Sequence, residues 1–240
     1  MIIEQFHREF KLTADKVDSL AYAEFEPWEI DSMLNKAQDM LIKQRYGGNN
    51  LYKSGFEQSQ KRTDDLNSIT TTKFAKVIPV TELDFYGDKI YQAKLDQFYN
   101  DENWSSLYDG EYMFYLRSRA KIKKGSCTSW KSVNLVKQDD IETIYVDPFN
   151  RPSPENPVIY FEDNSIFIIS GTGAVDSFTV SFIKRPAQMN IGNYVGEKTE
   201  CELSEHFHRE IVERAVSIAL EGIGSERTQS HAVINESKIE

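Results

Sequence analysis

The segment 27–46 constrains the fold most, because its apolar residues recur with the period of an α-helix. Six of them fall at positions i, i+3, i+4, i+7, i+10 and i+11: Ile30, Met33, Leu34, Ala37, Met40 and Leu41. This spacing places all six on one face of a helix. Pro27 suits the first helical turn, and the pair Gly47–Gly48 suits the end of the last one. An apolar face of this width needs a partner surface elsewhere in the chain.

A second amphipathic segment lies near the other end of the chain, at 204–223. Ser204 is a good N-cap, and five residues then recur on one face: Phe207, Ile211, Ala215, Ile218 and Gly222. This helix and the 27–46 helix carry the two widest apolar stripes, so we expect them to pack against each other. The same periodicity predicts two further helices: 2–11 and 56–66.

From about Lys73 the sequence period changes from 3.6 residues to two, which is typical of β-strands. Apolar runs separated by turn residues predict six short strands: 74–80, 111–123, 128–136, 158–161, 166–170 and 177–184. A helical turn is expected at 139–146. A series of short antiparallel strands with turn signals between them predicts a small β-sandwich or barrel.

The helical ends and the strand-rich middle together predict an α+β fold. In this prediction a helical bundle is built from the N- and C-terminal segments, and an antiparallel β-sandwich or barrel is inserted between them. The expected domains are 1–70 with 186–240 for the helical part and 71–185 for the β-rich part. A chain of 240 residues is long enough to bury a sizeable core.

Composition narrows the class of protein. Apolar residues make up 40% of the chain and the net charge is −10, which indicates a globular chain and argues against a dedicated nucleic-acid binder. No run approaches the roughly 18 apolar residues of a membrane span, and no secretory signal is visible. Cys127 and Cys201 match no metal-ligand spacing, so we expect a reduced, intracellular origin.

No catalytic signature is present in the sequence. The nucleophile-elbow, P-loop, zinc-protease and C-x-x-C patterns are all missing. His206 and His208 diverge by about 200° on a helix, so they cannot share a metal from one face. The run Gly171–Gly173 joins two expected strands and leads into no helix whose N-terminus holds a phosphate, which indicates a hairpin turn. We therefore expect a protein that is not an enzyme and needs no metal or cofactor.

The strongest local charge anomaly lies between Arg117 and Lys137, where seven residues are basic and none is acidic. Alternation along the 111–123 strand places four of these cations on one side. The candidate contact residues are Arg117, Arg119, Lys121, Lys123, Lys124 and Lys131. One interpretation is a solvated strand face that charge protects against aggregation. The other is a docking face for an acidic neighbour or for passing DNA.

The last stretch of the chain, 224–240, reads GSERTQSHAVINESKIE and has few apolar residues to bury. Such a segment gains little from packing on its own fold. We expect it to lie along a partner subunit, with Val233 and Ile234 as small apolar anchors.

Several short motifs resemble those of a known family, the head-to-tail connector (ring, or adaptor) proteins of tailed bacteriophages. The likeness is nearest to the short-tailed crAss-like phages. The motifs are Ile2-Ile3-Glu4-x-Phe6-x-x-x-Phe10, Phe25-Glu26-x-Trp28-Glu29-Ile30-Asp31, Leu34-Asn35-x-Ala37-Gln38, Lys43-Gln44-Arg45-Tyr46, Phe56-Glu57-x-x-Gln60-Lys61-Arg62-x-Asp64-Asp65-Leu66 and Leu203-x-x-x-Phe207-His208-x-Glu210-Ile211-Val212-x-Arg214-Ala215-Val216. They cover about half of the chain, all of it in segments expected to be helical.

The resemblance implies a structural virion protein of the phage neck. Such a protein forms a homo-oligomeric ring, usually of twelve copies, that joins the portal protein to neighbouring ring or tail proteins and extends the DNA channel used in ejection. It implies that the helical domain forms the ring and that DNA passes without sequence recognition. It also implies no membrane partner and a location in the virion neck after synthesis in the host cytoplasm.

A ligand-binding module is the alternative function. In that case the β-sandwich binds a glycan as part of a virion or cell-surface assembly, and exposed aromatic residues form the binding face. The candidates are Trp104, Tyr108 and Trp130, each of which is equally compatible with a core position.

Overall fold

The computed structural model of the chain forms two units. The residues that it describes are 1–17, 25–47, 64–80, 87–104, 107–108, 111–192 and 196–223. One unit comprises Met1–Ile69 and Pro186–Glu240, and the other comprises Thr70–Arg185. We call them the helical unit and the barrel unit, and each is described by itself.

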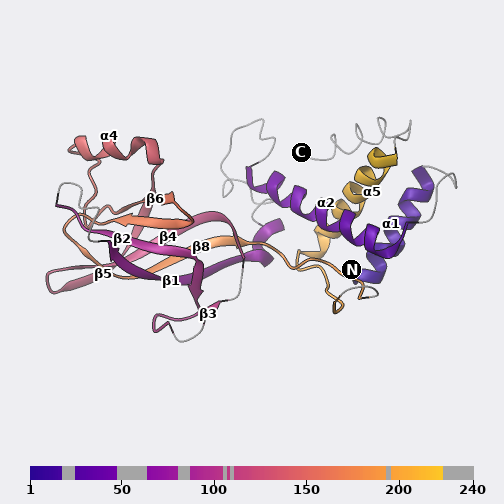
Figure 1. Cartoon of the computed structure of the whole chain (residues 1–240), viewed down its shortest axis with the longest axis horizontal. Helices are drawn as coiled ribbons and strands as arrows, with labels where there is room; N and C mark the ends of the chain where they lie inside the picture. Colours follow the sequence, from indigo (N-terminus) through magenta and orange to yellow (C-terminus); the bar gives the residue numbers. More distant parts are fainter. Residues whose placement is uncertain are drawn as a thin grey trace. The chain divides into compact units, whose positions relative to one another are not determined.

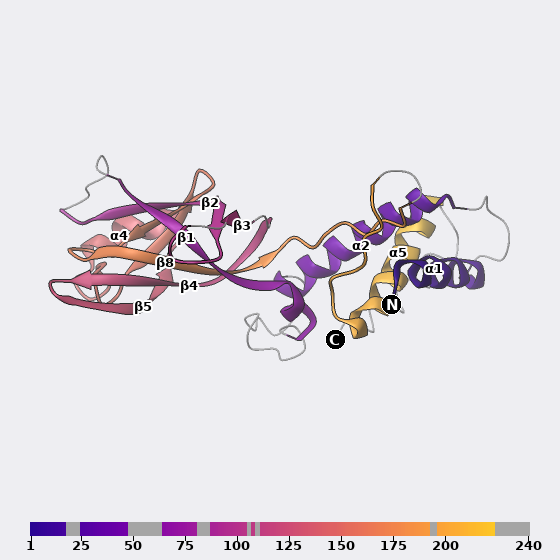
Figure 2. The same ribbon diagram turned by 90° about the horizontal axis from the view of Figure 1, so that it is seen from below.

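The barrel unit is built on a single eight-stranded sheet (Figures 1 and 2). Its strands are β1 (Thr70–Val80), β2 (Ile90–Tyr99), β3 (Leu107–Tyr108), β4 (Tyr112–Lys124), β5 (Cys127–Leu135), β6 (Val158–Glu162), β7 (Ser165–Ile169) and β8 (Ala174–Lys184). The strand order is β1-β8-β4-β5-β6-β7-β2-β3, and β1 also pairs with β2. This extra pairing closes seven strands into a barrel and leaves β3 attached to β2. All pairs are antiparallel except β5 with β6.

The predicted fold class, a helical bundle with an inserted antiparallel β-sandwich or barrel, is wrong. In the described residues, the main structure is one sheet of eight strands, seven of which close into a barrel, with few helices, and the sheet contains a parallel pair. The sequence hides part of this sheet because β2 lacks strict alternation: Ile90, Tyr91 and Ala93 are all buried. A 3.6-residue stripe that repeats over several turns is conspicuous in a sequence, so periodicity favours the helices over the sheet that dominates the structure.

The barrel interior is filled by side chains, as expected for a barrel with this number of strands. The residues of the interior core cluster alternate along the strands, for example Phe178, Val180 and Phe182 on β8. The Phe182 ring stacks on that of Phe98 from β2, with 4.6 Å between centroids. Alternation of this kind fixes the register, because a slip of one residue would turn the apolar set outward.

A second apolar layer covers the outside of the barrel. The 3-10 turn η3 (Gln138–Asp140) leads into α4 (Ile141–Val146), so the expected helical turn at 139–146 is confirmed. Buried Tyr145 of α4 packs with residues of β6 and β7 that point away from the interior, such as Val158 and Phe167. Both faces of these strands are thus covered, which explains their unbroken apolar sequence.

The helical unit contains three main helices: α1 (Ile3–Val17), α2 (Pro27–Gly47) and α5 (His208–Ile223). Short 3-10 turns, η2 (Asn67–Ile69) and η4 (Glu205–Phe207), lie before β1 and α5. The predicted contact between α2 and α5 is confirmed, and α1 also contacts α5. The predicted helix at 56–66 lies largely outside the described residues, which include only a helical turn at 64–66.

The buried face of α2 is rotated relative to the predicted stripe. Ile30, Leu34, Ala37 and Leu41 are buried as expected, but Met40 is exposed. Three residues on the other side of the stripe are buried instead: Gln38, Ile42 and Arg45. The two polar residues, Gln38 and Arg45, are tolerated inside the unit because each has hydrogen-bonding or charged partners. The segment after Pro186 provides further partners for polar residues of α2.

The segment after Pro186 lies along α2 and is held there by hydrogen bonds from side chains of α2 to its backbone. The amide of Asn35 donates to the carbonyl of Met189 (2.9 Å) and accepts from its N–H (2.8 Å). The Asp31 carboxylate accepts from the N–H of Ile191 at 3.2 Å. Polar residues within a helix thus satisfy backbone groups of a stretch whose described residues before η4 form no regular strand or helix.

The two cysteines lie in different environments, so their thiols should react at different rates. Cys127 is exposed, whereas Cys201 is half-buried beside Gln38, whose side-chain oxygen lies 3.6 Å from the sulfur. Burial raises the pKa of the Cys201 thiol to about 11, which leaves little thiolate at pH 8. We expect iodoacetamide at this pH to modify Cys127 first, with Cys201 reacting only after unfolding in urea. Peptide mass spectrometry over time measures both rates, and equal rates in the folded protein would contradict this assignment.

Candidate functional site

The cations singled out in the sequence gather on the outside of the barrel. Along β4, Ser118, Ala120 and Ile122 point into the barrel, and the basic residues between them point outward. We call the following set the basic face: Arg117, Arg119, Lys121 and Lys123 of β4, Lys124 at its end and Lys131 of β5. The alternation expected from the sequence is therefore present in this part of the strand.

The start of β4 departs from simple alternation. The register shifts between Tyr112 and Phe114 and again between Tyr115 and Arg117. As a result, both Tyr112 and Tyr115 pack against the barrel core although they are an odd number of residues apart. Irregularities of this kind re-aim side chains. The outward row of cations begins directly after the second one.

Short hydroxyl side chains flank the basic face. Three of them on β8 lie opposite cations of β4 in the register: Ser177, Thr179 and Ser181. The Nε of Arg117 donates to the Ser181 hydroxyl at 3.5 Å. Because serine and threonine are short, the longer basic side chains extend beyond their neighbours. Ser177 and Ser181 are buried, so the surface is formed mainly by the cations, which bind carboxylates or phosphates.

Lys121 of the basic face lies near two carboxylates. Its ammonium lies 3.3 Å from a Glu102 oxygen and 3.7 Å from an Asp176 oxygen. The ring of Trp130 lies opposite on β5, with the Arg119 and Lys121 charges 5.9 and 6.0 Å from its centroid. These distances are within the range of cation–π attraction. Trp130 thus fixes the position of two cations.

Glu155 pairs with two cations at one end of the basic face, Lys124 and Lys131. It accepts from Lys131 at 2.6 Å and lies 3.7 Å from the ammonium of Lys124. The hydrogen bond from Lys131 lowers the pKa of the Glu155 carboxyl. Among the residues that the structure describes, three cations of the face pair with no carboxylate: Arg117, Arg119 and Lys123. These three are available to an external acidic group.

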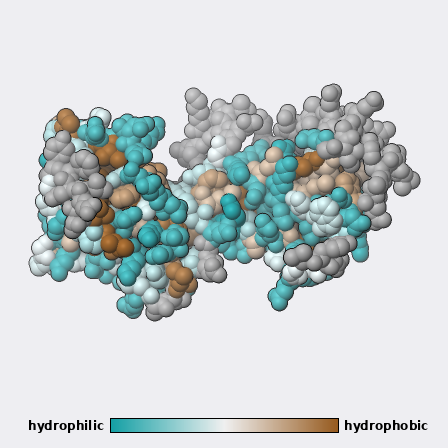
Figure 3. All heavy atoms as spheres, in the orientation of Figure 1, coloured by the Kyte–Doolittle hydropathy of each residue, from teal (hydrophilic) through white to brown (hydrophobic). Residues whose placement is uncertain are grey.

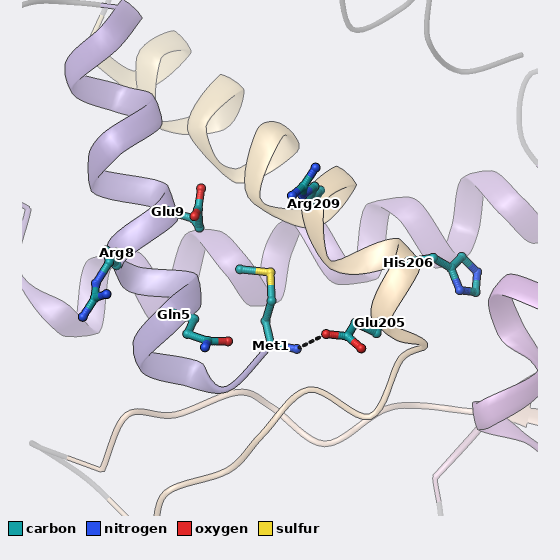
Figure 4. Close-up of a pocket in the computed structure, with 7 residues that line it drawn as sticks. All are labelled: Met1, Gln5, Arg8, Glu9, Glu205, His206 and Arg209. Atoms are coloured by element: carbon teal, nitrogen blue, oxygen red, sulfur yellow. Dashed lines mark ion pairs between the residues drawn. The ribbon is translucent and has the colours of Figure 1, made fainter.

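A cavity of about 620 Å³ lies in the helical unit, between α1 and the start of α5 (Figure 4). It is lined by Met1, Gln5, Arg8, Glu9, Glu205, His206 and Arg209. Charges of both signs line it, and the amino group of Met1 lies 3.6 Å from Glu205. In the described part of the chain no three His, Cys, Asp or Glu side chains are grouped so as to hold a metal ion.

The two histidines near this cavity have separate partners. His206 Nε2 lies 2.8 Å from Asp65, whereas His208 Nε2 donates to the carbonyl of Leu203 at 2.9 Å. The other ring nitrogen of His208 then accepts from the Met1 amino group at 2.8 Å. Burial lowers the pKa of His208. The expected divergence of these side chains is therefore confirmed.

The glycine run between β7 and β8 is a tight turn, as predicted. Gly171 has φ of +60°, a conformation that glycine adopts without strain. A Cβ on Gly173 would lie 2.6 Å from the side chain of Ile122 and 3.1 Å from that of Pro154. The turn therefore packs directly against its neighbours, which explains why both positions are glycine.

Comparison with known proteins identifies the family. The family model described as phage tail ring protein 3/4 matches residues 1–231. The chain belongs to the phage tail ring protein family. Ring protein 3 of Bacteroides phage crAss001 is 26% identical over an alignment of 204 residues, and the match covers 81% of this chain and 84% of the relative. Ring protein 4/5 of the same phage is 23% identical over an alignment of 236 residues, and the match covers 91% of this chain and 92% of the relative.

Family membership confirms the resemblance seen in the sequence and makes this chain a structural ring protein of a bacteriophage virion. No helix in the described part of the ring protein is long and apolar enough to cross a membrane. The family model matches residues 1–231, so the match extends through the strand-rich middle as well as the helical ends.

The remaining candidate residues fall in different places. Tyr108 packs against the barrel core, and Trp104 contacts the ring of Tyr99 edge-on. Trp130 lies on the outer side of β5, beside Arg119. The three aromatic residues therefore have different neighbours. Val233 and Ile234 lie outside the described residues of the ring protein. Their role as partner anchors stays a prediction.

Sequence analysis missed one exposed apolar feature of the ring protein. Val146 and Phe149, at the end of α4 and just after it, are 77% and 92% exposed. Hydrophobic side chains elsewhere on the viewed surface of the barrel unit are mostly dispersed among hydrophilic ones (Figure 3). The sequence contains no signal for this exposure, because an apolar residue is by default expected to be buried.

Proposed function

We propose that this chain forms a closed ring in the virion neck, where it joins the portal to the tail and extends the DNA channel. The observation that carries this proposal is the match of the family model to residues 1–231, supported by two relatives named as ring proteins and matched over most of their length. We propose twelve copies per ring, with the portal protein and adjacent ring or tail proteins as partners.

The charge of the chain is compatible with a DNA conduit. DNA carries one negative charge per roughly 1.7 Å of axis, and a wall rich in cations would retain it. A protein with net charge −10 lets DNA slide past without binding its phosphates strongly. Within this proposal the basic face contacts either a neighbouring subunit or the DNA, and residues 224–240 dock on a partner through Val233 and Ile234.

Depleting this protein during infection tests the proposed position. If it joins the portal to the tail, particles assembled without it should be heads that lack attached tails and fail to retain DNA. Electron microscopy of the particles and measurement of their packaged DNA give both results. Supplying the wild-type chain from a plasmid should restore tailed particles. Tailed, infectious particles that lack the protein would contradict the proposal.

A further inference from the structure

We propose that neighbouring copies of this chain contact each other through two different surfaces of the barrel unit. One surface is the basic face of one copy. The other is an acidic and apolar knob of the next copy, which we define as residues 138–149 and which comprises η3, α4 and the turn after it. This inference rests on the proposed function, since it assumes that copies of the chain close into a ring.

Hydrogen bonds hold the backbone of the knob around Phe149. The N–H of Phe149 donates to one oxygen of Asp147 at 2.9 Å, and the side chain of Asn150 donates to the other at 2.6 Å. Tyr145 anchors α4 on the barrel. Because this backbone is already ordered, binding has to order only the exposed Phe149 side chain, which lowers the entropic cost. Phe149 is therefore suited to be an anchor that inserts into a partner.

Acidic residues precede the exposed apolar pair Val146 and Phe149. Three exposed acidic side chains lie at the start of the knob: Asp139, Asp140 and Glu142. Within the described part of the chain, no cation forms an ion pair with any of them. The knob is thus an unpaired negative surface, and the basic face on the same unit is a partly unpaired positive one.

The two surfaces lie on different sides of the barrel. The basic face lies on β4 and the adjoining part of β5, whereas α4 covers the outside of β6 and β7 (Figure 1). Going around the seven-strand barrel, β4 at the centre of the basic face is three strands from β7, and β5 and β6 lie between them. One subunit therefore exposes surfaces of opposite charge on different parts of the barrel.

This arrangement suits head-to-tail association. When two different surfaces of a subunit are complementary, each copy binds the next in the same way, and the series closes into a ring if the rotation permits. Complementary charges select the partner surface and its orientation. A role in the DNA channel is disfavoured, because unpaired arginines facing the lumen would bind phosphates and oppose sliding. Trp130, fixed beneath Arg119 and Lys121, supplies an apolar surface for Phe149.

Reversing the charge of each surface separately tests this pairing. The face variant carries Arg117→Glu and Arg119→Glu, and the knob variant carries Asp139→Lys, Asp140→Lys and Glu142→Lys. A control variant carries Lys76→Glu and Lys94→Glu, which reverse exposed cations of β1 and β2 outside both surfaces. The full-length proteins are compared by native mass spectrometry, with circular dichroism to confirm that each is folded.

We expect neither reversed variant to form rings at the concentration where the wild type and the control do. An equal mixture of the two variants should form rings again, with the two kinds of subunit alternating, because every contact then joins unlike charges. Phe149→Ser should raise the concentration needed for half-assembly at least about tenfold, a typical effect of losing an interface anchor.

Other outcomes would overturn the inference. Rings formed by a reversed variant alone, or a folded mixture that does not assemble, would exclude this pairing. Normal rings of the face variant combined with loss of DNA from particles would assign the basic face to the channel. In these cases wild-type rings would still support the proposed function. Failure of the wild type to form any ring would instead contradict both.

Discussion

Replacing Phe182 by alanine should lower the free energy of unfolding of the barrel unit by about 3–5 kcal/mol. This side chain is fully buried in the barrel interior. It stacks on Phe98 and also contacts the rings of Tyr108 and Tyr112. Removing the ring loses its transfer free energy and leaves a cavity that the closed sheet cannot collapse to fill. Urea denaturation followed by circular dichroism measures the loss.

Phe149→Ala is the matched control, since the substitution is identical and only the environment differs. Phe149 is 92% exposed, so its truncation should change the free energy of unfolding by no more than about 0.5 kcal/mol. A similar loss in both variants would mean that Phe149 packs against the fold. No loss at Phe182 would refute the closed barrel core.

The second large effect is expected at Arg45 in the helical unit. This buried residue of α2 ties three segments together. Its Nε lies 2.8 Å from buried Asp65, although the two are poorly aligned for a hydrogen bond, and its Nη2 donates to Glu210 of α5 at 2.5 Å. Its guanidinium also lies 5.4 Å from the ring centroid of Phe207. Arg45→Met should cost about 3–5 kcal/mol, because buried Asp65 then loses its arginine countercharge and keeps only its contact with His206.

An exposed arginine provides the control. Arg185 pairs with Glu111 at 3.1 Å, and both side chains are more than half exposed. Arg185→Met should therefore cost only about 0–1 kcal/mol, because solvent screens the pair. A double variant, Arg45→Met with Asp65→Asn, should recover part of the loss, since it removes the unpaired charge. If the double variant were no more stable than Arg45→Met, the cost would arise from packing and not from charge.

Local periodicity predicted the positions of most helices and strands but not the way they assemble. The helices α2 and α5 are visible in the sequence because each buries one apolar stripe. The strands β4 to β8 are visible because each alternates between apolar and polar residues or forms a short apolar run. Strand β2 was missed since its first residues are buried on both sides, by the barrel core and by α4. Closure of the barrel depends on the pairing of β1 with β2, and long-range pairing leaves no periodic signal.

The candidate site was predictable in part. Alternation along β4 correctly placed Arg117 to Lys123 on one exposed side, since it depends only on strand geometry. Which of these cations are neutralised depends on residues far away in the sequence, such as Glu102 and Asp176 beside Lys121. The exposure of Phe149 could not be predicted either, because it results from the placement of α4 on the barrel.

The most direct test of the ring assignment is the mass of the full-length protein in solution. Native mass spectrometry should find one closed species of twelve copies of the 27.7 kDa chain. Electron microscopy of the same sample should show a ring with a central hole. A monomer, or an open series of oligomers with no preferred copy number, would contradict a closed ring of this chain.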